Sequence, residues 1–145
     1  MKTDTGSGPV RRILIVEDNR GDVILVEVAL REAGLQFELI HLADGEKAVD
    51  YLLKLGNGNG GSSLDLVLLD LNLPKRDGWE VLETLRSIAL PHPVPVMILS
   101  SSSAPHDIAR AERLGVSKYI RKPSTLDEYL AIGRAVKQLW PVSGQ

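Results

Sequence analysis

The chain has 145 residues, of which 43% are hydrophobic and 25% charged. This size and composition fit one folded domain and exclude a mostly disordered chain. With 17 basic and 19 acidic side chains, the net charge of −2 provides no overall positive field for nucleic acid. The absence of cysteine excludes disulfides, thiolate metal sites and a cysteine nucleophile. Because no apolar run approaches the roughly 20 residues of a membrane span, we expect a cytoplasmic protein without membrane contact.

Short apolar runs alternate with helical patterns along the chain. Residues 13–16 are continuous, apolar and β-branched, which is typical of a strand buried on both faces. Residues 22–33 then have helical spacing, and Gly34 ends that helix. Later strands are predicted at 37–42, 66–69, 94–99 and 116–121. A helix is predicted after each of them: the first begins at Asp44 and the second at Asp77, the third contains residues 108–114, and the fourth begins near Thr125. The Gly-rich segment 57–63 lacks the Gly-Lys-Ser/Thr ending of a phosphate-binding loop and is interpreted as a linker.

Five strands, each followed by a helix, predict an α/β fold: a doubly wound, five-stranded parallel sheet in the flavodoxin-like order 2-1-3-4-5. The carboxyl ends of parallel strands meet at one edge, where such folds bind ligands. The polar residues expected at that edge are Glu17, Asp18, Asp70, Ser100 and Lys122. Three clustered carboxylates repel one another unless a cation lies among them, and oxygen ligands favour Mg²⁺. Lysine and serine there can hold phosphoryl oxygens.

Four segments, ILIVEDN, LVLLDLNLPKRDGWEVL, VMILSSS and YIRKP, together resemble the response-regulator receiver domain of two-component signalling. The resemblance implies that Asp70 accepts a phosphoryl group from the phosphohistidine of a partner kinase. It implies that Glu17 and Asp18 form the acid pair of a metal site. In that site, Mg²⁺ is bound directly by Asp18, Asp70 and the backbone carbonyl of Asn72.

The resemblance also assigns roles in the response to phosphorylation. Ser100 takes the position of the switch hydroxyl, and Tyr119 that of the aromatic switch residue. Lys122 is the lysine that contacts the phosphoryl group, and its bond to Pro123 is the one that the family commonly has in cis. We therefore expect Asp70 to be the nucleophile, with Lys122 and Ser100 completing the phosphoryl site.

The domain is expected at 11–140, between tails at 1–10 and 141–145, with no DNA-binding module. The expected function is that of a phosphoacceptor which changes protein–protein interactions and is not an enzyme. EDNRGD, LNLPKRDG and a last helix ending in Leu139-Trp140 resemble single-domain regulators that accompany bacterial phytochrome kinases. The expected partners are therefore a histidine kinase, with a bacteriophytochrome as the candidate, and a downstream signalling or phosphotransfer protein.

A homodimer is predicted from apolar residues near the carboxyl end of the chain. We expect a continuous apolar seam over the helix after the fourth strand, the fifth strand and the last helix, formed by Ile108, Leu114, Tyr119, Tyr129 and Trp140. A two-fold interface through this face would be self-complementary. The alternative for Trp140 is ordinary packing of the last helix on the core.

Other functions are weighed against this one. A Mg²⁺-dependent aspartyl-phosphate phosphatase of the haloacid-dehalogenase type needs a second carboxylate where this chain has Asn72. A nucleotide- or flavin-binding module needs a Gly-rich turn where residues 17–20 read Glu-Asp-Asn-Arg. A degenerate receiver acting only as a scaffold would lack a site residue. His41, His92 and His106 lack metal or triad spacing and are interpreted as surface or edge residues.

Overall fold

The structure, a computed structural model, describes residues 9–58 and 64–140. The predicted tails lie almost entirely outside these ranges, and so do residues 59–63 of the predicted linker. In the described part of the chain, strands and helices alternate from the first strand to the last helix, as the apolar pattern predicts.

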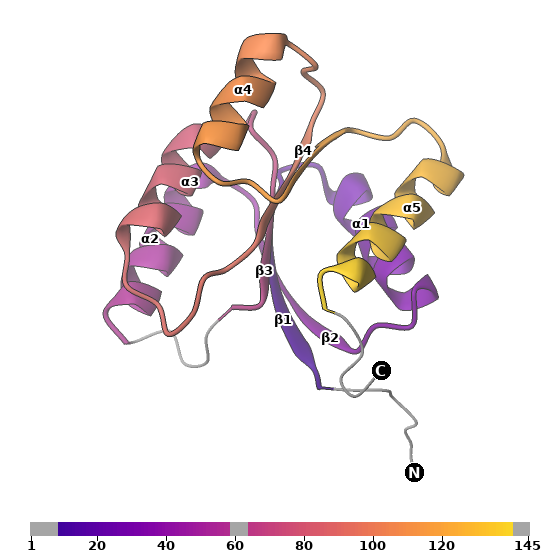
Figure 1. Cartoon of the computed structure of the whole chain (residues 1–145), viewed down its shortest axis with the longest axis horizontal. Coiled ribbons are helices and arrows are strands. Elements are labelled where there is room, and N and C mark those ends of the chain that lie inside the picture. The colour runs from indigo at the N-terminus through magenta and orange to yellow at the C-terminus, as the bar shows by residue number, and fades with distance from the viewer. Residues whose placement is uncertain (1–8, 59–63, 141–145) are drawn as a thin grey trace.

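One parallel sheet runs through the middle of the molecule (Figure 1). The order of its strands is β2-β1-β3-β4-β5, which confirms the predicted topology. The strands are β1 (Arg11–Val16), β2 (Phe37–Leu42), β3 (Leu66–Leu69), β4 (Val96–Ser100) and β5 (Lys118–Arg121). The three central strands β1, β3 and β4 have their apolar side chains buried, because helices cover both faces of the sheet.

Five helices form the two outer layers, with α1 and α5 on one face and α2, α3 and α4 on the other (Figure 1). The helices are α1 (Arg20–Glu32), α2 (Gly45–Gly56), α3 (Gly78–Ser87), α4 (Pro105–Arg113) and α5 (Leu126–Gln138). Asp44, Asp77 and Thr125 accept backbone hydrogen bonds as the N-caps of α2, α3 and α5, as predicted. The longest helices in the described ranges have 13 residues, too few to cross a membrane.

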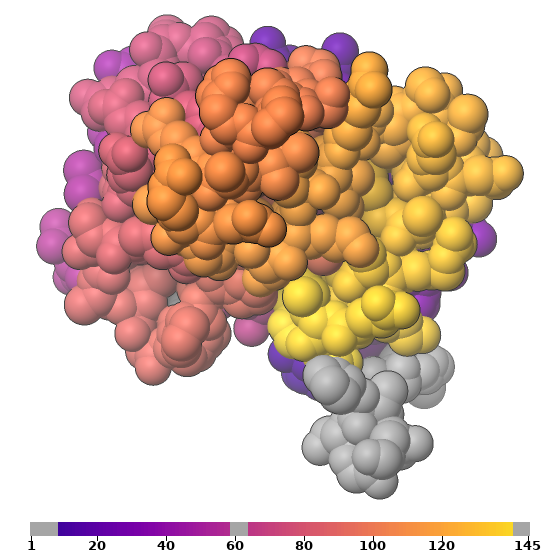
Figure 2. All heavy atoms as spheres, turned by 45° about the horizontal axis from the view of Figure 1, so that its top comes forward, coloured from indigo at the N-terminus to yellow at the C-terminus, as the bar shows by residue number. Residues whose placement is uncertain are grey.

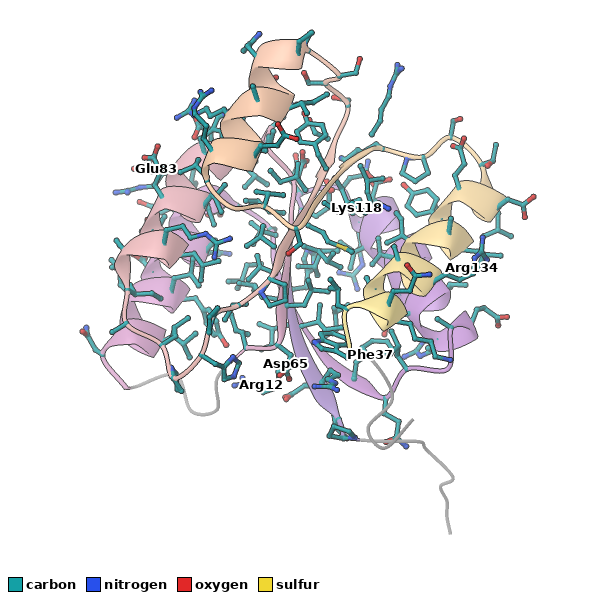
Figure 3. The ribbon with its side chains drawn as sticks, in the orientation of Figure 1. Arg12, Phe37, Asp65, Glu83, Lys118 and Arg134 are labelled. Carbon is teal, nitrogen blue, oxygen red and sulfur yellow. The ribbon has the colours of Figure 1, made fainter. Side chains whose placement is uncertain are left out.

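At the amino ends of the strands, opposite the expected site, two polar residues are hydrogen-bonded to each other. The backbone amide of Arg12 donates to the Asp65 carboxylate at 2.8 Å, and the amide of Asp65 donates to the carbonyl of Arg12 at 2.8 Å. Figure 3 shows both side chains at the amino end of the strands. The polar groups of the candidate site therefore lie at the other end, where the strands lead into α1, α3 and α4.

The expected apolar seam is not present, because four of its five members belong to opposite faces of the sheet. The fifth, Ile108 on α4, is half-buried and belongs to neither core cluster. Leu114 and Tyr119 pack against the cluster beneath α2 and α3. Tyr129, only 6% exposed, belongs to the cluster beneath α1 and α5, and Trp140 packs against that same cluster. The guanidinium of Arg11 covers the Trp140 ring at 4.6 Å. In Figure 2, α4 and α5 form neighbouring parts of the surface that faces the viewer, but their apolar side chains point into separate cores.

Candidate functional site

Backbone hydrogen bonds that continue the sheet hold the candidate residues at its carboxyl edge. The amide of Glu17 donates to the carbonyl of Leu42 at 3.1 Å, and that of Asp70 donates to the carbonyl of Val16 at 3.0 Å. On the other side, the amide of Lys122 donates to the carbonyl of Ser100 at 2.8 Å. Glu17, Asp70 and Lys122 thus each follow directly on a strand, in fixed register with the neighbouring strand. The sheet brings together side chains that lie 105 positions apart in the sequence.

Asp70 lies at the centre of this edge and is 4% exposed. One carboxylate oxygen accepts the backbone amide of Asn72 at 3.1 Å, and the other accepts the Lys122 ammonium at 3.2 Å. Gly78, the first residue of α3, lies directly against this backbone, since a Cβ at that position would meet the carbonyl oxygen of Asp70. Both oxygens of Asp70 are therefore oriented, and the glycine lets α3 begin close to the end of β3.

An acidic cluster surrounds this position. Carboxylate oxygens of Glu17, Asp18 and Asp70 lie within 4.8 Å of one another; Glu17 and Asp70 are buried, and Asp18 is exposed. Burial, and then the negative charge of Asp70, raise the pKa of Glu17 from 4.5 to about 7. Three oxygen donors with excess negative charge and one solvent-facing member fit a hard divalent cation.

Lys122 supplies the positive charge of the site. Its Nζ lies 3.1 Å from Glu17, 3.0 Å from Asp22 and 3.2 Å from Asp70. Burial alone would lower the pKa of Lys122, but hydrogen bonds with Asp22 and Glu17 and the charge of Asp70 raise it overall. The ammonium therefore stays charged throughout the physiological pH range. Its peptide bond to Pro123 is trans, which corrects the expected cis bond; the ammonium reaches the carboxylates with the lower-energy isomer in place.

The loop after β4 connects Ser100 to Tyr119. Ser100 is fully buried, and its hydroxyl oxygen accepts the amide of Ser102 at 3.1 Å. The carbonyl of Ser102 accepts the Tyr119 hydroxyl at 2.9 Å, and the Ser102 hydroxyl donates to Asp107 in the first turn of α4 at 2.7 Å. A change at Ser100 thus has a short path, through Ser102, to both β5 and α4.

Two residues at this edge escaped the sequence interpretation. Asp22, in the first turn of α1, is a third carboxylate on Lys122 and also accepts the Tyr129 hydroxyl at 2.9 Å. His41, near the end of β2, donates through Nε2 to the carbonyl of Glu17 at 2.8 Å. Asp22 lies in the EDNRGD segment, but the sequence does not show which groups its carboxylate contacts. Nothing in the sequence distinguishes His41 from an ordinary edge residue.

Comparison with known proteins agrees with this geometry. Residues 13–133 match the family model described as the response regulator receiver domain. The chain belongs to the response-regulator receiver family. Response regulator Rcp1 of Synechocystis sp. is 34% identical over 134 residues, which cover 92% of this chain and 91% of the relative.

Two solved structures of receivers are also similar. The phosphorylated cyanobacterial phytochrome response regulator RcpA superposes with a TM-score of 0.80 at 35% identity, covering 94% of this chain and 98% of that one. The Mn²⁺-bound form of Rcp1 has a TM-score of 0.75 at 32% identity, covering 93% and 96%. Both similarities extend over nearly the whole of each chain.

Proposed function

We propose that this receiver is a phosphoacceptor response regulator in which Asp70 takes a phosphoryl group from the phosphohistidine of a kinase. The observation that carries the proposal is the position of Lys122, whose ammonium lies 3.2 Å from a buried Asp70 oxygen beside two further carboxylates. An anionic nucleophile next to a fixed cation is what phosphoryl transfer requires, because the developing charge on the phosphoryl oxygens must be neutralised. Residues 11–140 would form the working domain.

The residues that would hold Mg²⁺ are Asp18, Asp70 and the carbonyl of Asn72, with Glu17 completing the acidic site. Support comes from the acidic cluster and from the metal named for the Rcp1 structure. Bound there, the ion would neutralise phosphoryl oxygens and relieve the repulsion among the carboxylates. After burial, the charge of Asp70 is the second cause of the raised pKa of Glu17, which is a further sign of that repulsion.

The transfer step uses the protein's own groups as follows. The Asp70 oxygen attacks phosphorus, the new P–O bond forms an acyl phosphate, and the P–N bond to the kinase histidine breaks. The imidazole leaves and takes up a proton. Lys122 shifts its third N–H from the carboxylate to a phosphoryl oxygen. The backbone N–H of Asn72, which donates to the other Asp70 oxygen, keeps the nucleophile aligned.

Output would follow from the loop after β4. The Ser100 hydroxyl would turn toward the phosphoryl group and give up the amide of Ser102. Ser102 binds both the Tyr119 hydroxyl and the first turn of α4, so its displacement would change the surface made by α4, β5 and α5. The phosphoryl group would favour one of two pre-existing conformations through its differential contacts.

The partners follow from the names of the relatives. A protein named as a phytochrome response regulator is 35% identical to this chain, which supports a histidine kinase of the phytochrome type as the donor. The receiver would act in the cytoplasm on a downstream signalling or phosphotransfer protein, without nucleic acid or membrane and without turning over a substrate. A homodimer through α4, β5 and α5 stays a prediction, but Leu114 and Tyr129 pack inward and would not form its contacts.

Phosphotransfer from an autophosphorylated histidine kinase of the phytochrome type tests this function. Radiolabel should move from the kinase to this chain in the presence of Mg²⁺ and be lost with EDTA. Asp70→Asn should accept no label, whereas Asp77→Asn, in the nearby N-cap of α3, should accept it as the wild type does. Label on the Asp70 variant would place the acceptor elsewhere.

A further inference from the structure

We propose that Asp22 is a positioning residue for Lys122, and that Tyr129 holds Asp22 in place so that α1 and α5 together aim the lysine ammonium at Asp70. The proposal deepens the function proposed above and rests on it. It assigns a role in phosphoryl transfer to two side chains outside the set of residues that the receiver resemblance implies.

The three N–H donors of the Lys122 ammonium are directed by the carboxylates around it. An ammonium has three N–H donors and no acceptor. Here three carboxylates surround it at similar distances: Asp22 at 3.0 Å, Glu17 at 3.1 Å and Asp70 at 3.2 Å. With two donors directed to Glu17 and Asp22, the third is directed to the Asp70 oxygen. Without Asp22, the ammonium at the end of a four-carbon chain would be free to rotate, and that direction would no longer be fixed.

The second step is the anchoring of Asp22 itself. One of its carboxylate oxygens binds Lys122, and the other accepts the Tyr129 hydroxyl at 2.9 Å. Its backbone amide donates to the side chain of Asn19, which caps α1, at 3.0 Å. Asp22 cannot turn toward solvent without breaking the bond to a tyrosine that is 6% exposed. Burial, and then the bond to Asp22, raise the pKa of Tyr129 to about 12, so the hydroxyl keeps the proton that it donates to Asp22.

The third step is the rigidity of the frame behind this pair. Gly133 lies one turn after Tyr129 on α5, and a Cβ there would meet the carbonyl oxygen of Ala29 on α1. The two helices are therefore in close backbone contact one turn of α5 beyond Tyr129. A shift of α5 relative to α1 would be felt at Lys122 through two hydrogen bonds. The acceptor site is thus linked to the α1–α5 face, in addition to the path through Ser102.

A charge effect and a positioning effect of Asp22 change the kinetics of phosphorylation differently. If Asp22 only adds negative charge, its removal should lower the concentration of acetyl phosphate that gives half the maximal rate. If it positions Lys122, its removal should lower the rate at saturating acetyl phosphate instead. Tyr129→Phe separates these further, because it removes the anchor and leaves the charge of Asp22 unchanged.

The experiment compares Asp22→Asn and Tyr129→Phe with two matched controls on α2, Asp50→Asn and Tyr51→Phe. Saturating rates of phosphorylation by acetyl phosphate with Mg²⁺ should fall roughly three- to tenfold for Asp22→Asn and about twofold for Tyr129→Phe. Both controls should keep the wild-type rate. In the same proteins, without phosphodonor, NMR relaxation at the Lys122 Cε should show greater mobility in the two test variants only.

Unchanged Lys122 mobility in Asp22→Asn would overturn the proposal, and so would increased mobility with an unchanged saturating rate. Failure of the wild type to take up phosphate on Asp70 would instead overturn the proposed function. The relaxation measurement would then still decide whether Asp22 and Tyr129 hold the lysine, because it needs no phosphorylation.

Discussion

Replacing Glu17 by glutamine should flatten the pH dependence of the stability of the metal-free protein. Glu17 is 2% exposed, and burial together with the charge of Asp70 raises its pKa from 4.5 to about 7. A carboxyl group whose pKa is raised by folding binds its proton more tightly in the native state. The contribution of Glu17 to the free energy of unfolding is therefore highest at low pH and falls as the pH rises from 4.5 to about 7.

The magnitude follows from the size of the shift. One pKa unit corresponds to about 1.4 kcal/mol, so the wild type should lose about 3 kcal/mol of unfolding free energy through Glu17 across that interval. For a domain of this length, that loss is roughly 10 °C in Tm. The charge interaction between Lys122 and ionised Glu17 lowers the pKa of Glu17 and is already contained in the net shift. It therefore adds no separate pH-dependent contribution to the comparison with Glu17→Gln.

Urea unfolding in EDTA at about pH 5 and about pH 7.5 measures the effect as a difference between proteins. The stability of the wild type relative to Glu17→Gln should fall by about 2–3 kcal/mol between the two pH values. Glu32→Gln, at the exposed end of α1, is the control and should follow the wild type. Parallel pH profiles for wild type and Glu17→Gln, within about 0.5 kcal/mol, would refute the reasoning.

Three further predictions test packing and the metal site. Gly133→Ala should lower the free energy of unfolding by about 1–3 kcal/mol, because its Cβ would meet the carbonyl oxygen of Ala29; a loss below about 0.5 kcal/mol in urea would contradict this contact. Asp18→Ala should weaken Mg²⁺ binding about tenfold or more in titrations followed by Trp79 fluorescence, and wild-type affinity would remove Asp18 from the ligands. Arg86→Ala should cost about 2–3 kcal/mol, since its guanidinium donates to three backbone carbonyls; an unchanged urea midpoint would show those bonds to be dispensable.

The fold was predictable because its apolar signals are local, and the errors at element ends come from hydrogen bonds of the residues beside each helix. The first helix begins two residues earlier than predicted, because the Asn19 side chain accepts the amide of Asp22 and lets Arg20 and Gly21 enter the helix. The fifth strand begins two residues later, because the amide of Val116 is bound to the end of α4. Apolar runs locate a strand, but such hydrogen bonds decide where it starts.

The candidate site was predictable only where the sheet itself places the residue. Parallel strands must bring Glu17, Asp70 and Lys122 to one edge, so their meeting follows from topology. The contacts of Asp22 and Tyr129 depend instead on how α5 rotates against α1. Helical spacing shows that Tyr129 lies on an apolar stripe, but it does not show which layer that stripe faces. This is why the expected seam with α4 was wrong.

The most direct test of the central claim is the intact mass of the protein after incubation with acetyl phosphate and Mg²⁺. The wild type should gain the mass of one phosphoryl group, and hydroxylamine should remove it, as expected of an acyl phosphate on Asp70. Asp70→Asn, which keeps the shape of the side chain, should gain nothing under the same conditions. A phosphoryl group on the Asp70→Asn protein, or one on the wild type that resists hydroxylamine, would contradict the account.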